Sequence, residues 1–528
     1  MPDTDQSKVA SAASVVGSAT MLSRVFGFLR DVVVAAFFGT SAAADAFFVA
    51  FRIPNLLRRL LGEGSLTAAF VPVFTQYLTQ KSKAEAIELA NVVFTALSII
   101  LVFVSLLGIV FSPWIIMAIA PGFVDTPDQF ALAVYLNRIM FPYIFFISLV
   151  ALCMGILNSL RHFAAPALSP VALNLSMIAA TLLLHTCFAE PVFALAMGVM
   201  LGGVIQLAMQ WPFLVKMGVR LKPNFNFRHP GLRQIGYLLL PTLIGAGIYQ
   251  INIFIGTILA SLLPKGSVSY LYYADRIVEL PLGVFAIAVG TAVLPTLSEQ
   301  VSRGSFGDLR KTISFSLRLI LFVSIPATIA LIILREPIIS VLFQRGSFDA
   351  ASTVATAQAL FYYSLGLMAF SVIRVIDGTF FALQDRKTPL KAGFAAVIVN
   401  VVMSVILMGP LKHGGLALAT SIATSVNVLI LFFILRKKIG PFLDGEFYGS
   451  LKKILLASAV MIASIYAVHS AIGWNLHDDL LSKCFYLFSC TAAGGFAFFV
   501  TSFLVKNQDL LFLWEQLKRK FSRRGMNP

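Results

Sequence analysis

The sequence predicts an all-α polytopic membrane protein of about 14 transmembrane helices, with two parallel six-helix lobes followed by two C-terminal helices. Three observations predict this class: the composition, long apolar runs and an internal repeat. Of the 528 residues, 58% are hydrophobic and only 12% are charged, whereas roughly 25% of residues are charged in a soluble globular protein. A chain of this size cannot bury so much apolar surface in soluble cores.

The apolar runs divide the chain into expected membrane spans. Each run holds about 20 residues, which is the length a helix needs to cross the hydrocarbon core. The expected spans are 12–38, 41–76, 91–119, 130–157, 165–187, 191–215, 234–262, 268–298, 312–343, 355–383, 390–410, 414–435, 450–472 and 481–505. Pro54 and Gly62 predict a bent or broken helix in the second span.

Basic residues fall in alternate loops, as the positive-inside rule predicts for a polytopic protein. The loops after the even-numbered spans are rich in Lys and Arg, and the other loops carry only four exceptions, Lys265, Arg345, Lys412 and Lys483. Both termini are therefore predicted to be cytoplasmic. The net charge of +16 follows from this distribution and does not indicate a nucleic-acid partner.

The internal repeat has an almost constant offset. "AFRI" (50–53) recurs as "ADRI" (274–277), and "SPWIIMAIAPG" (112–122) aligns with "EPIISVLFQRG" (336–346), both 224 residues apart. Pro72 and Pro295 keep an offset of 223. Because the repeating unit holds an even number of spans, the two halves have the same orientation, which is typical of transporters with a central, alternately opened cavity.

The repeat predicts four parts of the chain. Residues 1–218 form an N-terminal six-helix lobe, residues 219–440 form a C-terminal six-helix lobe, residues 441–506 form two extra helices, and residues 507–528 form a basic cytoplasmic tail. Within this tail, 510–524 has apolar residues on one side and basic residues on the other. It is typical of an interfacial helix on an anionic leaflet, with a solvated cationic tail as the alternative.

Ionisable residues inside the expected spans are the candidate binding residues. An ionisable side chain at mid-bilayer costs about 2.5–3.5 kcal/mol on insertion scales and persists where it meets water or a partner. The candidates are Arg24, Arg30, Asp31, Asp45, Arg52, Arg58 and Glu63 in the first lobe, and Asp275, Arg276 and Glu279 in the second. Arginines outnumber carboxylates in the first two spans, and the planar guanidinium suits phosphate or carboxylate groups.

Two structural interpretations compete with anion binding. Some of these residues could form ion pairs that hold helices together, such as Asp31 with Arg24 or Asp275 with Arg276, and Arg58 or Arg59 could reach the interface from a helix end. In the tenth span, Arg374 and Asp377 lie three residues apart, which predicts an internal ion pair or part of a coupling-ion site.

Enzymatic chemistry has no support in the sequence. We find no phosphate-binding glycine loop, no paired aspartates of the metal-diphosphate type and no metal-ligand spacing among the Cys and His residues. We therefore expect no enzyme, no bound metal and no cofactor, with the membrane potential or a coupling ion left open as the energy source.

Several motifs resemble the MurJ (MviN) family, within the MOP superfamily that also contains multidrug exporters. They are "SRVFGFLRD" (23–31), "TSAAADAFFVAFRIPNLLRRLLGEG" (40–64), "APGF" (120–123), "SVSYLYYADRIVELPLGV" (267–284) and "GPLKHGG" (409–415). The resemblance runs over nearly the whole chain.

The resemblance implies a flippase for lipid II, the undecaprenyl-diphosphate-linked precursor of peptidoglycan, in the bacterial inner membrane. It implies a role in cell wall biogenesis and cell shape, with other cell-wall synthesis proteins as further partners. It assigns the cavity arginines to Arg24, Arg30, Arg58 and Arg276, and a groove for the lipid tail to the two extra helices. Some members bind sodium in the second lobe, where this chain has Arg374.

Three alternative functions can be compared by the chemistry that each requires. A flippase for another polyprenyl-linked saccharide would use the same diphosphate and tail contacts. A multidrug exporter of cationic compounds should have mostly carboxylates in its cavity, whereas arginines dominate here. A membrane-embedded transferase would need metal-binding carboxylates, and the sequence lacks their motif.

Overall fold

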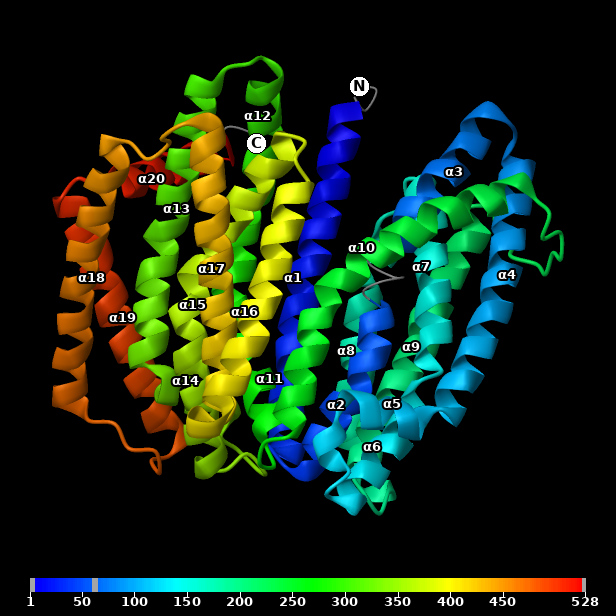
Figure 1. Cartoon of the computed structure of the whole chain (residues 1–528), viewed down its shortest axis with the longest axis horizontal. Helices are drawn as coiled ribbons and strands as arrows, with labels where there is room; N and C mark the ends of the chain where they lie inside the picture. The colour runs from blue at the N-terminus through cyan, green and yellow to red at the C-terminus, as the bar shows by residue number, and fades with distance from the viewer. Residues whose placement is uncertain (1–4, 59–64, 525–528) are drawn as a thin grey trace. The chain divides into compact units, whose positions relative to one another are not determined.

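The fold is helical throughout the described part of the chain, residues 5–58 and 65–524 of a computed structural model (Figure 1), where no strand occurs. The first helices are α1 (Asp5–Phe38), α2 (Ala42–Leu57), α3 (Leu66–Gln80), α4 (Lys83–Val110), α5 (Ser112–Ile119), α6 (Pro127–Met140), α7 (Tyr143–Ser159), α8 (Ala164–Leu184), α9 (Val192–Lys216) and α10 (Pro230–Ser261). The all-α prediction is therefore confirmed.

The remaining helices follow the same pattern. They are α11 (Ser267–Pro281), α12 (Ile287–Ser302), α13 (Phe306–Ile333), α14 (Arg335–Phe343), α15 (Ala350–Ala382), α16 (Lys387–Leu411), α17 (His413–Ile439), α18 (Gly445–Ile472), α19 (Leu480–Leu504) and α20 (Gln508–Arg524). A π-helical segment, Leu282–Ala286, joins α11 to α12.

Every expected span coincides with one or more helices, but the count of 14 is not confirmed. Among the described residues, ten helices are long and apolar enough to cross a membrane. Several expected spans contain two helices: the run 91–119 is α4 and α5, and the run 312–343 is α13 and α14. Proline explains these breaks, because Pro113 and Pro337 each lie within the first three residues of the second helix and cannot continue the preceding one.

Helix boundaries keep the spacing of the sequence repeat. Helices α4 and α13 both have 28 residues, and Phe306 comes 223 residues after Lys83. The segments Pro127–Ser159 and Ala350–Ala382 both have 33 residues and begin 223 residues apart. The repeat is thus also present in the secondary structure, while the assignment of two lobes stays a prediction.

Two compact units divide the chain differently from the predicted lobes. The first contains residues 1–269 and 345–348, and the second contains residues 270–344 and 349–528. Helix α10 belongs to the first unit, where it packs on α3 and adds Ile235 to a buried core around Phe70, Phe74 and Leu89. The repeat would instead place α10 at the start of the second lobe.

Helix α20 is docked on the second unit through its first turns. Asp509 is 1% exposed and accepts a hydrogen bond from Ser450 of α18. Its other oxygen lies 3.6 Å from Nε of Arg318 in α13, and Nη1 of Arg318 donates to Glu446 at 2.8 Å. Phe512 contacts the ring of Phe315. The amphipathic tail segment is therefore a helix packed on α13 and α18, and its position at a membrane surface stays a prediction.

Candidate functional site

The charged residues of α1 form a network with α8 in the first unit. Arg30 donates to Oδ1 of Asp31 from Nη2 at 2.7 Å and from Nε at 3.1 Å, and its Nη1 donates to Asn174 of α8 at 3.1 Å. Asn174 in turn donates to the backbone carbonyl of Ser23 at 3.2 Å. Asp31 is 3% exposed. This network fixes the direction of the Arg30 guanidinium and joins α1 to α8.

Arg24 has a different environment. Its side chain is exposed, and it makes no hydrogen bond or ion pair with any described residue. The expected pair of Arg24 with Asp31 is not formed. Seven residues of helix rise separate the two positions by about 10 Å, and the short aspartate pairs with the adjacent Arg30 instead. The Arg24 guanidinium is therefore available to a ligand, because it is not engaged in an ion pair that holds helices together.

Asp45, at the start of α2, connects the two repeats within the first unit. Its Oδ1 accepts hydrogen bonds from the backbone N–H of Ser269 at 2.8 Å and from the Ser269 hydroxyl at 2.5 Å, and its Oδ2 accepts from Gly266 at 2.6 Å. Ser269 is the repeat equivalent of Asp45, 224 residues later. These three bonds make Asp45 a structural link at the start of α11, and its contact with a substrate stays a prediction.

Two repeat-related glycines pack at the same junction. A Cβ atom on Gly122 would lie 2.1 Å from the carbonyl oxygen of Ser261, and a Cβ atom on Gly346 would lie 2.2 Å from that of Ala36. Ser347 adds a hydrogen bond from its backbone N–H to Ala36 at 2.8 Å. The turn after α5 thus meets the end of α10, and the turn after α14 meets the end of α1. We call the contacts of Asp45, Gly122 and Gly346 the inter-repeat junction.

The remaining candidates of the first unit lie along α2. Arg52 and Asn55 line a small pocket with Gln250 of α10, and Nε of Arg58 donates to Asn55 at 3.1 Å. Glu63 lies outside the described residues.

In the second unit, the candidates lie on α11. Nη1 of Arg276 donates to Glu279 at 2.6 Å, one helical turn away, and the guanidinium lies 4.8 Å from the ring centroid of Tyr272. Asp275 and Glu279 are exposed, and Arg276 is half-buried. The aromatic ring and the carboxylate together fix the direction of Arg276.

Arg374 and Asp377 do not form the expected ion pair among the described residues. Arg374 is exposed and Asp377 is half-buried in α15, and no nitrogen of Arg374 comes within 4.0 Å of the Asp377 carboxylate. Within the described residues, no group of three or more His, Cys, Asp or Glu side chains is arranged to hold a metal ion. A coupling-ion site at Asp377 stays untested.

Sequence reasoning missed the partners that position these charges. The pattern of charged residues does not identify Asn174 or Ser269, although both are polar residues in or beside apolar helices. A lone asparagine in the run 165–187 is the one signal that could have been used, because a buried amide requires hydrogen-bond partners. The sequence offers no sign of which partner it meets.

Comparison with known proteins identifies the family. A family model described as lipid II flippase MurJ matches residues 34–484. A probable lipid II flippase MurJ of Buchnera aphidicola is 37% identical over 471 residues, covering 89% of this chain and 92% of its own. A lipid II flippase MurJ of Burkholderia cenocepacia is 37% identical and covers 81% and 84% of the two chains.

The chain belongs to the MurJ family. A solved structure of a lipid II flippase MurJ in an inward closed conformation is 29% identical, with a TM-score of 0.76, and covers 93% of this chain and 99% of its own. An inward-facing multidrug resistance MATE transporter of the MOP superfamily has a TM-score of 0.65 at 17% identity, covering 81% and 98%. This second likeness concerns the fold alone and fits the MurJ assignment.

Proposed function

We propose that this protein is a lipid II flippase that moves the undecaprenyl-diphosphate-linked precursor from the cytoplasmic to the periplasmic leaflet for cell wall synthesis. Membership of the MurJ family over most of the chain carries this proposal. The protein acts in this proposal as a transporter and not as an enzyme. Its partners are the lipid-linked substrate and membrane lipids.

Arginines recognise the diphosphate in this proposal. A diphosphate is a doubly charged, multi-oxygen acceptor, and guanidinium groups bind such groups with paired, charge-assisted hydrogen bonds. Arg24 is exposed and without a partner among the described residues, and Arg30 is held by Asp31 and Asn174. Arg276 is oriented by Tyr272 and Glu279. Such prior orientation lowers the entropic cost of binding.

Alternating access supplies the movement. The inter-repeat junction acts as the periplasmic gate and parts when the headgroup is released. The membrane potential supplies the driving force, because each negative charge moved to the positive outside across 100 mV gains about 2.3 kcal/mol. Neither a nucleotide nor a resident metal takes part, and both termini stay in the cytoplasm of an inner-membrane protein.

The arginine hypothesis predicts loss of growth. In cells that depend on this protein, single Arg24→Ala, Arg30→Ala and Arg276→Ala variants should fail to support growth while reaching normal membrane levels. Arg303→Ala is the matched control, because Arg303 is 71% exposed in a loop and pairs with Glu299, and it should grow normally. Normal growth of all three cavity variants at normal levels would overturn the hypothesis.

The substrate is tested by depletion of the protein. Lipid II should accumulate in the cytoplasmic leaflet when the protein is removed, and a lipid II-cleaving enzyme supplied in the periplasm should lose its substrate. Accumulation of a different polyprenyl-linked saccharide, with lipid II unchanged, would favour the alternative substrate.

A further inference from the structure

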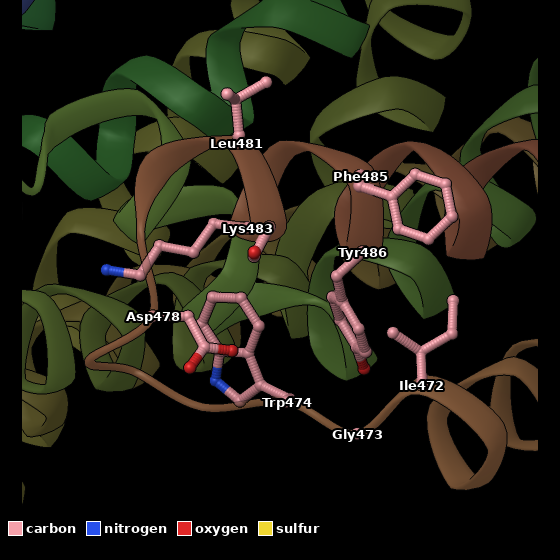
Figure 2. A pocket seen from close by; sticks show the side chains of 9 residues that line it. Ile472, Gly473, Trp474, Asp478, Leu481, Lys483, Phe485 and Tyr486 are labelled. Carbon is pink, nitrogen blue, oxygen red and sulfur yellow. The ribbon is translucent and has the colours of Figure 1, made fainter.

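A cavity of about 430 Å³ lies where α18 ends and α19 begins, within the second unit (Figure 2). Its lining includes Trp474, Asp478, Lys483, Phe485 and Tyr486. By the charge distribution of the loops, this end of the two helices faces the periplasm. Tryptophan and tyrosine are typical of the headgroup level of a bilayer, so the cavity lies where lipid headgroups would be found.

Lys483 is one of the few basic residues on this predicted side of the membrane. The structure buries it: the residue is 6% exposed, and its Nζ donates to Oε1 of Gln344 at 3.1 Å. An ammonium group carries three donors, and one of them is used in this bond. A buried cation is costly unless acceptors or an anion compensate it. The remaining donors of Lys483 could therefore bind an anionic group in the cavity.

The carboxylates beside Lys483 have separate environments. Asp479 caps α19 and accepts from Leu481, Ser482 and the Ser482 hydroxyl. Asp478 is exposed on the cavity wall and makes no side-chain hydrogen bond with a described residue. No salt bridge within 4.0 Å joins Asp478 to Lys483 among the described residues. Both carboxylates interact electrostatically with Lys483, but the Asp478 carboxylate of the cavity is not joined to Lys483 in an ion pair.

An apolar face continues from the cavity along α19. Leu481, Phe485 and Phe488 are 80%, 62% and 73% exposed. Their spacing of four and three residues places them on one side of the helix. Figure 2 shows Leu481 and Phe485 on the same helix as Lys483. Exposed apolar residues beside a charged cavity fit a molecule with a polar head and hydrocarbon chains.

We propose that this cavity binds the headgroup of a zwitterionic phospholipid. The lipid phosphate accepts from Lys483, its ammonium group donates to Asp478, and its acyl chains lie along Leu481, Phe485 and Phe488. Charge complementarity favours this occupant, since an ammonium group forms a charge-assisted pair with the Asp478 carboxylate, whereas the hydroxyls of an anionic headgroup donate only weaker hydrogen bonds from a neutral donor. The site is independent of the proposed transport function.

Fluorescence of Trp474 provides the test, because this residue lines the cavity. The full-length chain, with its other three tryptophans replaced by Phe, is placed in nanodiscs of phosphatidylglycerol that contain either brominated phosphatidylethanolamine or brominated phosphatidylglycerol. We expect the ethanolamine lipid to quench Trp474 fluorescence to the extent that corresponds to an about threefold enrichment of this lipid at the cavity. This is the size of effect that one partly exposed ion contact produces. Equal quenching by the two lipids would overturn the proposal.

Variants then assign the contacts. Asp478→Asn should abolish the preference for the ethanolamine lipid, whereas Lys265→Gln, a lysine on the same predicted side of the membrane, should leave it unchanged. Lys483→Gln should weaken quenching by both lipids, because both carry the phosphate that Lys483 contacts in the proposal. Lys483→Arg keeps the charge and should retain quenching by both lipids, so it serves as the test variant if Lys483→Gln fails to fold. A preference that survives Asp478→Asn, or displacement of the quencher by undecaprenyl phosphate, would contradict the proposal.

Discussion

Gly122→Ala should weaken the inter-repeat junction. The added Cβ would lie 2.1 Å from the Ser261 carbonyl oxygen, whereas an ordinary contact needs at least 3.4 Å, so the two backbone segments must part. No flexible side chain can move aside, because the three atoms nearest to the added Cβ all belong to the backbone. Overpacking of this kind costs about 1–3 kcal/mol. If the junction is the periplasmic gate, this energy shifts the equilibrium towards its open form by about 5- to 150-fold.

A buried cysteine reports the opening. Ala260 is 3% exposed, next to Ser261 at the end of α10. In a background without the four native cysteines, Ala260→Cys in right-side-out spheroplasts should react with an impermeant maleimide at a rate set by the open population. Gly122→Ala should raise that rate at least about fivefold.

The control is a glycine within an apolar helix. Gly393 in α16 has nothing within 4 Å of an added Cβ, so Gly393→Ala should leave the labelling rate unchanged. An unchanged rate in Gly122→Ala, or an equal rise in Gly393→Ala, would refute the reasoning that backbone contact at Gly122 keeps the junction closed.

Two further predictions concern the networks that position charged groups. Asn174→Leu removes the acceptor of Arg30 and should lower stability by about 1–3 kcal/mol, seen as a lower midpoint of thermal unfolding in detergent; an unchanged midpoint would contradict it. At Asp509, burial raises the pKa of the carboxyl despite its hydrogen bond with Ser450. Because the folded pKa is raised, the docked state gains stability as pH falls from neutrality through that pKa towards the ordinary value of about 4. Hydrogen exchange of the α20 amides, corrected for intrinsic rates, should therefore slow as the pH falls. Asp509→Asn should abolish this slowing. Faster corrected exchange at low pH would contradict the assignment of the effect to Asp509.

The helical membrane class and the helix positions could be predicted from the sequence. Apolar runs and loop charges are local properties, since the cost of exposing backbone polar groups to lipid forces each long apolar run into a helix. The repeat is visible because equivalent residues keep their spacing along the chain. The helix breaks beside Pro113 and Pro337 are indicated locally by the prolines themselves, but a count of apolar residues alone does not detect them.

The environment of each charged residue could not be predicted in the same way. Arg24, Arg30 and Asp45 are equally costly in an apolar segment, and the sequence treats them alike. Spacing on one helix even predicted a pair of Arg24 with Asp31 that does not form. Asn174, which accepts from Arg30, and the residues that donate to Asp45 lie more than 100 positions away, and no periodicity within a span encodes such contacts.

The sequence by itself determined that this protein is a helical membrane transporter with repeated halves and an excess of arginine, because hydropathy, charge and repetition are written along the chain. The tertiary structure decided which charged side chains are available to a ligand and which are held in hydrogen bonds between helices. It placed Asn174 against Arg30, joined Asp45 to Ser269 across the repeat and buried Lys483 beside a cavity. Hydrogen bonds and close packing depend on distances in space, which only folding fixes.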